Sequence, residues 1–231
     1  MHQFAEFVIW YLVFIFSTTC HEAAHAFVAR RGGDDTAYAH GHVTLDPLPH
    51  IRREPFGMVI VPILSFFQLG WMMGWASVPY DAQWGARYPK RHALMSLAGP
   101  AANFVLAGLS LLAIKLLAGA GVFHLSGGGT SVGLVQLPEG YEFSSSLGAV
   151  ALALSAMLRL NVILGIYNLI PVPPLDGAAV IEGFGPSKLR QLFGHIRQNP
   201  MYQMLGLLVT WMIFPYIEAP ARLVVEHALY S

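Results

Sequence analysis

Residues 4–29 read FAEFVIWYLVFIFSTTCHEAAHAFVA, an apolar run that carries a His-Glu-Ala-Ala-His sequence near its end. Apart from Glu6 and the short stretch 17–19, the run is apolar up to its first histidine. About 20 apolar residues are enough for a helix to cross the hydrocarbon core of a bilayer. The run lacks a charged start and a small-residue cleavage site followed by polar sequence, so it is not typical of a removed signal peptide. We therefore expect a permanent membrane-spanning helix over residues 4–29.

The composition of the whole chain agrees with a membrane protein. Of the 231 residues, 55% are hydrophobic and 11% are charged, and the mean hydropathy is +0.53. Because soluble domains have about 25% charged residues, this chain has too few charges to cover a water-exposed surface. The net charge is zero, which excludes the general basic field that nucleic-acid binding needs. Cys20 is the single cysteine, so an internal disulfide is excluded as well.

Further apolar runs predict the rest of the fold. Two candidate spans lie near residues 93–117 and 147–170, and a shorter run predicts a C-terminal hydrophobic helix near 204–217, before Glu218. No polar segment is long enough to form a separate soluble domain. We predict an all-α multi-pass membrane protein whose single domain, residues 1–231, has a three-helix core.

The apolar segment 56–76 leaves two topologies open. It contains Pro62 and three glycines, which fit a broken, re-entrant element better than a regular helix. If the segment spans once, the basic segments on either side of it face opposite sides of the membrane. If it returns to the side it entered, the positive-inside rule makes every basic segment cytoplasmic, namely 30–54, 77–92 and 177–203. We favour the re-entrant topology, with an ordinary second span as the alternative.

The sequence His21-Glu22-Ala23-Ala24-His25 places three ionisable side chains in an otherwise apolar helix. Residues i and i+4 share a helix face, so both imidazoles can bind one ion, and the glutamate can reach water beside it. Two imidazoles, a third protein ligand and an open position for water are typical of catalytic zinc. Chance occurrence is the alternative. It is disfavoured because ionisable groups inside a membrane are costly and mark functional sites.

The depth of this motif follows from the rise of the helix. From Phe4 to His21 the helix rises roughly 25 Å, within a hydrocarbon core of about 30 Å. Arg30 and Arg31 follow at the end of the run, and the charge rule makes that end cytoplasmic. We therefore expect a metal site in the cytoplasmic half of a cell-membrane protein.

Residues 168–177, NLIPVPPLDG, contain the candidate third ligand, Asp176. Three prolines in four positions end the preceding helix and force an extended path. Extended backbone at membrane depth is tolerated only where it is buried in protein or lines a cavity. Since Gly177 permits a tight turn, the chain can unwind, present the carboxylate and turn. A proline-rich loop with a surface aspartate is the alternative.

Together these motifs resemble the site-2 protease family of intramembrane zinc metalloproteases. The signatures of that family, HExxH and N-x-x-P-x-x-x-[LF]-D-G, both occur here in the same order. Residues 99–103, GPAAN, are similar to its G-P-x-x-N motif, and residues 46–51, DPLPHI, are similar to a segment of its short prokaryotic members. The second match breaks at residues 52–54, where Arg-Arg-Glu replaces a single Asp. The segment 118–146 is too short for a PDZ insertion, so the chain resembles the minimal subgroup.

The resemblance implies a zinc-dependent endopeptidase that cuts peptide bonds in or near transmembrane segments of membrane proteins. It implies one zinc ion per chain with the ligands His21, His25 and Asp176, and Glu22 as the base that activates water. The implied partners are a transmembrane protein substrate and the lipid bilayer. The sequence indicates neither the particular substrate nor the oligomeric state.

Two asparagines are candidate substrate-binding residues. Asn103 lies in an apolar run, where it either joins two helices or lines the substrate cleft. Asn168 precedes the prolines, and either donates to the substrate and its developing oxyanion or caps freed carbonyls. Three more histidines follow the HExxH helix, but three protein ligands are sufficient, so we interpret them as polar loop residues: His40, His42 and His50.

Residues 38–45, YAHGHVTL, include β-branched residues directly after the HExxH helix. We hypothesise a short edge strand here that pairs with an unwound substrate, with a polar loop as the alternative.

Two other functions stay open. One is a catalytically silent membrane escort or binding protein of the same fold, which the intact Glu22 disfavours. The other is a transporter with a broken-helix ion site, which the lack of an internal repeat disfavours.

Overall fold

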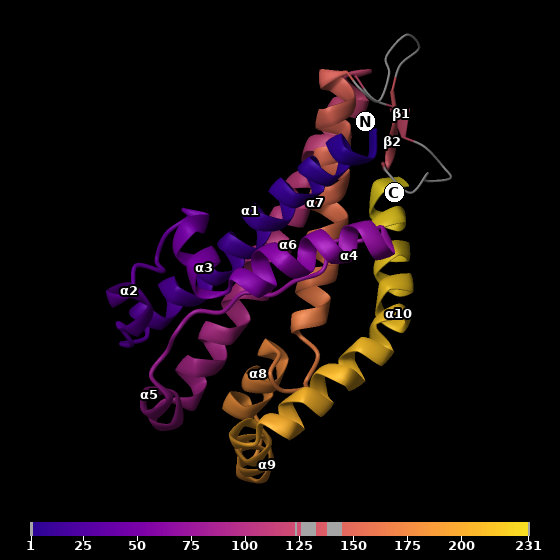
Figure 1. The fold of residues 1–231 in the computed structure, drawn as a ribbon. Helices are drawn as coiled ribbons and strands as arrows, with labels where there is room; N and C mark the ends of the chain where they lie inside the picture. The colour runs from indigo at the N-terminus through magenta and orange to yellow at the C-terminus, as the bar shows by residue number, and fades with distance from the viewer. Residues whose placement is uncertain (1, 123, 126–132, 138–144, 231) are drawn as a thin grey trace.

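The computed structural model describes residues 2–122, 124–125, 133–137 and 145–230. This part of the chain is mostly helical, and four of its helices are long and apolar enough to cross a membrane. They occupy the positions of the three expected spans and of the C-terminal helix (Figure 1): α1 (His2–Arg31), α6 (Pro89–Gly119), α7 (Ser146–Asn168) and α10 (Pro200–Tyr230).

The C-terminal helix is longer than the sequence predicts. The helix expected near 204–217 lies inside α10, which continues past two internal prolines to Tyr230. The reason is tertiary packing, because one face of the extension is buried against side chains of α6 and α7. That burial outweighs the backbone hydrogen bonds that the prolines lack. Its buried residues are spaced four apart: Ala221, Val225 and Leu229.

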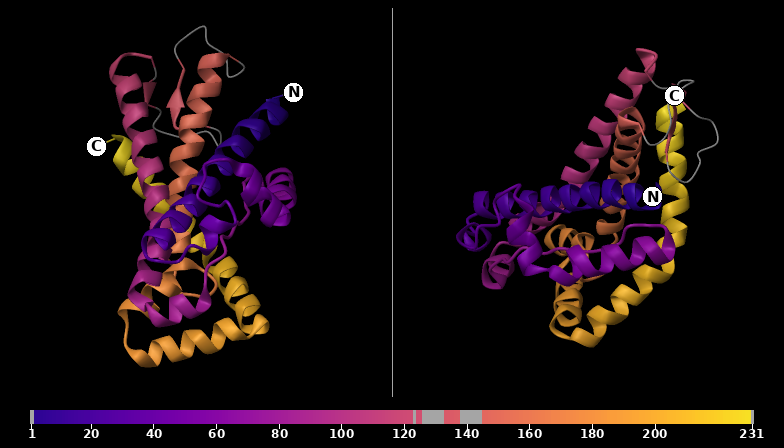
Figure 2. Two further views of the ribbon diagram at one scale, coloured as in Figure 1. Left: turned by 90° about the vertical axis from the view of Figure 1, so that its left-hand side faces the viewer. Right: turned by 45° about the horizontal axis from the view of Figure 1, so that its top comes forward.

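Three of the long helices form the core. α6 packs against both α1 and α7, and α1 also contacts α7. An apolar cluster joins α1 to α7, with the fully buried Phe14 and Leu152 in it. α10 lies beside α7 (Figure 1). Two shorter helices, α8 (Asp176–Phe184) and α9 (Ser187–Gln198), link α7 to α10 at one end of the molecule (Figure 2).

The segment 56–76 folds back on itself. Its first part is helical and consists of η1 (Phe56–Ile60) and α4 (Val61–Leu69). Gly70 ends this helix with a φ of +67°, and the chain returns in an extended form. Trp75 N–H then donates to the Gly57 carbonyl at 3.2 Å. At 1.5 Å per residue the helical part rises about 21 Å, which is less than a hydrocarbon core of about 30 Å.

The chain beyond this hairpin meets the end of α1. Asp81 N–H donates to the Asp34 carboxylate at 2.9 Å. The Trp84 ring N–H, in α5 (Ala82–Arg87), donates to the Gly32 carbonyl at 3.0 Å. The chain therefore begins α6 at the same end of α1 from which it entered the hairpin.

The edge strand expected at residues 38–45 does not form, so that hypothesis is wrong. The first of these residues belong to the helix α2 (Thr36–Ala39). Gly41 has a φ of +75°, and His42 N–H donates to the Ala37 carbonyl at 2.9 Å, so the chain turns. Backbone groups that are bonded within the turn cannot pair with a substrate strand.

The strands that the structure describes lie in the connection between α6 and α7. β1 (His124–Leu125) and β2 (Val135–Gln136) pair in the antiparallel direction, with His124 opposite Gln136. This small sheet lies at the end of the molecule opposite to α9 (Figure 2).

The short helix α3 (Pro47–Arg53) follows α2 in the chain. It begins at Asp46, whose side chain accepts a hydrogen bond from Leu48 N–H.

Candidate metal centre

Two histidines of α1 point into the protein core. His21 and His25 are 7% and 5% exposed. Their rings meet edge to face with centroids 4.6 Å apart, and their Nε2 atoms are 2.9 Å apart. Because a helix places residues i and i+4 on one face, this pairing follows from the spacing in the sequence.

Asp176 reaches the same place from the start of α8. Its Oδ2 lies 3.2 Å from His21 Nε2 and 3.3 Å from His25 Nε2. The proline-rich chain before it is not helical, as the sequence predicts. A Cβ on Gly177 would lie 2.6 Å from the Ile170 carbonyl oxygen, so only glycine fits there. The start of α8 thus packs tightly on the end of α7, which brings the carboxylate to the histidines.

Hydrogen bonds determine which ring nitrogen of each histidine carries its hydrogen. His25 Nδ1 lies 2.7 Å from the Met95 carbonyl oxygen, which can only accept. His21 Nδ1 lies 2.5 Å from Asn103 Oδ1, which is also an acceptor. A neutral imidazole has one N–H, so both rings carry it on Nδ1, and both Nε2 atoms are left with a lone pair.

In the neutral state of both rings, which metal binding requires, three acceptor atoms therefore converge with no hydrogen between them. Two nitrogen lone pairs and a carboxylate oxygen repel one another unless a cation lies among them. Their separations of 2.9, 3.2 and 3.3 Å are close to the value of about 3.4 Å for a tetrahedral zinc site with bonds of about 2.0–2.1 Å. Two imidazoles and one carboxylate, with a fourth position open, are the ligands of a catalytic zinc site. The residues present fit zinc.

Glu22 lies beside His21 and His25. Its side chain is 5% exposed, and its carboxylate is within 4.8 Å of the ligand nitrogens of His21 and His25. A carboxylate at this distance can accept a proton from a water molecule next to the ion.

A glycine of α6 forms one wall of the site. A Cβ on Gly99 would lie 2.5 Å from His21 Nε2 and 2.6 Å from His25 Cε1, where the ion would bind. Only glycine lets a helix pass so close to the two rings. Two residues of the motif at 99–103 therefore have identifiable physical roles. Gly99 leaves the space that an ion would need, and Asn103 contacts His21.

The structure places the two candidate substrate-binding asparagines in different surroundings. Asn103 is fully buried, with Oδ1 on His21 Nδ1 and with Nδ2 donating to Asn161 Oδ1 at 2.8 Å. Both ends of its amide are bonded within the protein, and the side chain is closed off from the surface. Asn168 lies at the end of α7, where its Nδ2 donates to the Leu164 carbonyl at 3.0 Å.

Sequence reasoning missed two groups that shape the site. The Met95 carbonyl is a backbone group, so its contact with His25 leaves no signal in the sequence. Asn161, by contrast, is a polar residue inside the apolar run 147–170 and could have been found by that criterion.

The histidines after α1 also differ from expectation. His40 is exposed, as a polar loop residue would be. His42 and His50 are buried instead, at 5% and 0% exposure, with ring centroids 5.1 Å apart. This loop has no periodic hydrophobic pattern from which their burial could be predicted.

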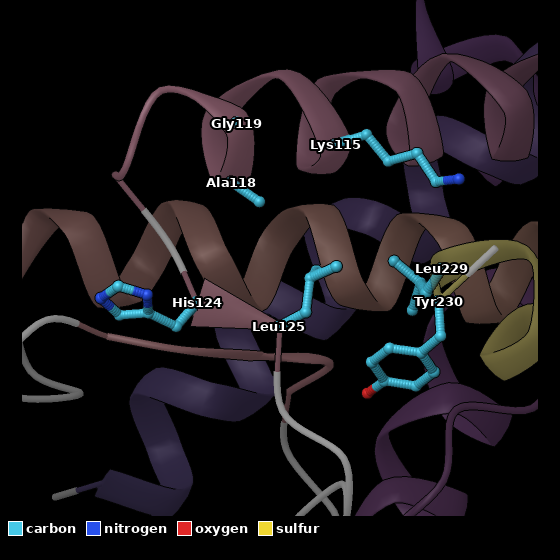
Figure 3. Close-up of a pocket in the computed structure, with 7 residues that line it drawn as sticks. All are labelled: Lys115, Ala118, Gly119, His124, Leu125, Leu229 and Tyr230. Atoms are coloured by element: carbon cyan, nitrogen blue, oxygen red, sulfur yellow. The ribbon is translucent and has the colours of Figure 1, made fainter.

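The structure also has a pocket of about 530 Å³ (Figure 3). The end of α6, β1 and the end of α10 form it, and its lining includes Lys115, His124 and Tyr230. From Gly99 to Lys115, α6 rises about 24 Å, so this pocket does not open onto the histidines.

Helices of membrane-spanning length around two histidines, an aspartate and a neighbouring glutamate are the features of a membrane metallopeptidase. Comparison with known proteins identifies the family. The sequence profile of peptidase family M50 matches residues 9–212. The chain therefore belongs to peptidase family M50, and the resemblance to site-2 proteases is confirmed.

The relatives of this chain are named as zinc enzymes. It is 32% identical to "Putative zinc metalloprotease YwhC" of Bacillus subtilis over 213 residues, which are 90% of this chain and 85% of that protein. It is 30% identical over 176 residues to "Putative zinc metalloprotease Rip2" of Mycobacterium tuberculosis, which covers 76% of this chain and 57% of that protein. No solved structure gives a significant match. Family and relatives agree on a zinc metalloprotease.

Proposed function

We propose that this protein is a zinc-dependent intramembrane endopeptidase, which hydrolyses peptide bonds in or near the transmembrane segments of other membrane proteins. The observation that carries the proposal is the convergence of three acceptor atoms, from His21, His25 and Asp176, within a bundle of membrane-length helices. A site at that depth meets chains that are themselves in the membrane, so its substrates are membrane proteins.

In the proposed mechanism these three residues hold one zinc ion. Zinc bound there supplies a Lewis acid that polarises the peptide carbonyl and lowers the pKa of water. Glu22 takes the proton from the attacking water and passes it to the leaving amine. Because Glu22 and both histidines are buried, bulk water is excluded and these electrostatic interactions are strong.

Asn168 is our candidate for holding the substrate. Its amide has two N–H donors, and one of them bonds to the Leu164 carbonyl in the same helix. We assign the second N–H to a carbonyl oxygen of the bound substrate, where it stabilises the developing negative charge. Asn103 has the different role of orienting His21.

We place the site in the cytoplasmic half of the cell membrane, with 56–76 as a re-entrant element. Arg30 and Arg31 at the end of α1 support that orientation. Arg91 donates to the Gly32 carbonyl at 3.0 Å, which supports the re-entrant topology. A segment that crossed once between these two residues would separate them by the thickness of the bilayer.

The experiment that tests the function compares wild type with Glu22→Gln. We expect Glu22→Gln to abolish cleavage and to keep its zinc, so that the substrate accumulates uncut in the membranes of cells that carry the variant. The control Glu6→Gln changes a partly buried glutamate nearer the start of the same helix, and should keep both cleavage and zinc. Equal membrane proteomes in wild-type and Glu22→Gln cells would favour the escort function, and ion-dependent solute uptake would favour the transporter.

Cysteine labelling tests the topology. Ser126, a natural site for a label beyond α6, lies outside the described residues, so we choose exposed positions that the structure describes. In a Cys20→Ala background, Gly41→Cys and Gln83→Cys should react from the cytoplasmic face, and Ala120→Cys from the opposite face. Labelling of positions 41 and 83 from opposite faces would contradict the re-entrant topology.

A further inference from the structure

Three polar side chains, one from each core helix, meet inside the apolar core. Ser17 of α1, Asn103 of α6 and Asn161 of α7 are each 0% exposed. Asn161 Nδ2 donates to Ser17 Oγ at 2.8 Å, and Asn103 Nδ2 donates to Asn161 Oδ1 at 2.8 Å. Buried polar groups are retained in such surroundings only when they are bonded. The mechanism above explains Asn103 through its contact with His21 and leaves Asn161 without a role.

The orientation of the Asn161 amide is determined by its own helix. Its Nδ2 lies 2.8 Å from the Met157 carbonyl oxygen, which can only accept. The nitrogen must therefore face the Met157 carbonyl and Ser17, and Oδ1 must face α6. A backbone carbonyl at a fixed place in α7 thus decides which end of the amide is the acceptor.

The orientation of the Asn161 amide determines that of the Asn103 amide, and through it the tautomer of His21. Since Asn161 offers an oxygen to α6, Asn103 must present its nitrogen to it. Asn103 Oδ1 then faces His21, so His21 carries its hydrogen on Nδ1 and has a lone pair on Nε2. His25 needs no such relay, because the Met95 carbonyl orients it directly.

We propose that Asn161 is a positioning residue of the metal centre, which holds His21 in its metal-ligating tautomer through Asn103. The inference rests on the metal site of the proposed function. Without Asn161, the Asn103 amide can turn over and present its NH₂ group to His21 Nδ1. The ring hydrogen then moves to Nε2 and blocks the lone pair that the metal needs.

Two substitutions of Asn161 separate this role from simple packing. Asn161→Leu removes the acceptor for Asn103 Nδ2. Asn161→Asp keeps an acceptor oxygen there, whether its carboxyl group is ionised or protonated. We expect Asn161→Leu to weaken zinc binding by about 10-fold, the lower end of the range for groups that orient a ligand. Asn161→Asp should stay close to wild type. Competition with a chromogenic zinc chelator in detergent measures the affinities.

The control is Ser110→Ala, which changes a buried polar residue of the neighbouring helix α6. The Ser110 hydroxyl bonds to the Leu106 carbonyl of its own helix, so zinc affinity should not change. Thermal unfolding of the zinc-free proteins is measured in parallel. A carboxyl group in the core should destabilise the fold at least as much as leucine does. A purely structural role for Asn161 would therefore make zinc affinity follow stability, with Asn161→Asp as weak as Asn161→Leu.

A spectroscopic measurement decides the matter even if Asn161→Leu fails to fold. In zinc-free wild type with ¹⁵N-labelled histidine, His21 should carry its hydrogen on Nδ1, with the signal assigned by its loss in His21→Ala. A His21 without a hydrogen on Nδ1, or wild-type zinc affinity in Asn161→Leu, would overturn the proposal. A wild-type protein that binds no zinc at all would overturn the metal site itself, so the two failures are distinguishable.

Discussion

The two halves of α6 meet very different surroundings, although the apolar run 93–117 extends through both. In the first half, Gly99 lies against His21 and His25 of α1, and Asn103 bonds to His21. In the second half, a Cβ on Gly108 would contact no other part of the described structure within 4 Å, apart from its chain neighbours and the nearby backbone of its own helix. The large side chains there are exposed, as expected of a surface that faces lipid: Leu109, Leu112 and Leu116. The same residue type is therefore required at one position of the helix and replaceable at another.

The largest effect should come from the proposed third ligand, Asp176, which begins the helix α8 that packs against α6. Asp176→Ala removes the carboxylate and leaves two imidazoles, too few to hold catalytic zinc. We expect loss of bound zinc and of cleavage, measured by metal analysis and by substrate accumulation. Asp46→Ala changes an aspartate that caps α3 and should keep both. Full zinc content in Asp176→Ala would mean that another group is the third ligand.

The next prediction compares the two glycines of α6 directly. Gly99→Ala places a methyl group 2.5 Å from His21 Nε2, in the space of the ion, so zinc binding and cleavage should be lost. Gly108→Ala adds the same methyl group where it meets nothing and should retain both. Zinc content per purified chain is the measurement. If both variants bind zinc alike, α6 does not form the wall of the site.

A smaller effect is expected for the amide that orients His21. Asn103→Leu removes the acceptor for His21 Nδ1, and we expect zinc affinity to fall by about 10- to 100-fold. Ser110→Ala, in the second half of the same helix, should leave the affinity unchanged because its bond is local. Competition with a chelator gives both constants. An unchanged zinc affinity in Asn103→Leu would mean that the contact between Asn103 and His21 serves only helix packing.

The smallest effect concerns His42, a buried histidine outside the candidate metal centre, and its burial affects the pH dependence of stability. Burial lowers the pKa of His42 below its ordinary value of 6.5, and the nearby His50, Arg53 and His40 lower it further. The unfolded chain therefore binds more protons in the window just below pH 6.5. The resulting stability is complete above about pH 6.5 and is lost as the pH falls through the folded-state pKa. Thermal unfolding should show this loss in wild type and less of it in His42→Asn, whereas equal pH slopes would contradict it.

The long helices could be predicted from the sequence, and the short connections could not. Apolar length is a local property, so runs near 4–29, 93–117 and 147–170 predict helices where the structure has them. The loop 38–45 was predicted as a strand from its β-branched residues, but local turn bonds and Gly41 decide its form. The end of α10 was placed too early because the apolar run stops before Glu218, whereas the packing of the last turns carries the helix on to Tyr230.

The candidate site shows the same difference between features determined locally and features determined by tertiary packing. By itself, the sequence determined that His21 and His25 share a helix face and that Asp176 follows a proline-broken helix. Those are consequences of the helical period and of proline chemistry, which act over a few residues. Only the tertiary structure decided that Asn161 of α7 is connected to His21 of α1 through Asn103. Their hydrogen bonds join residues 82 and 58 positions apart, and such contacts exist only once three helices have packed.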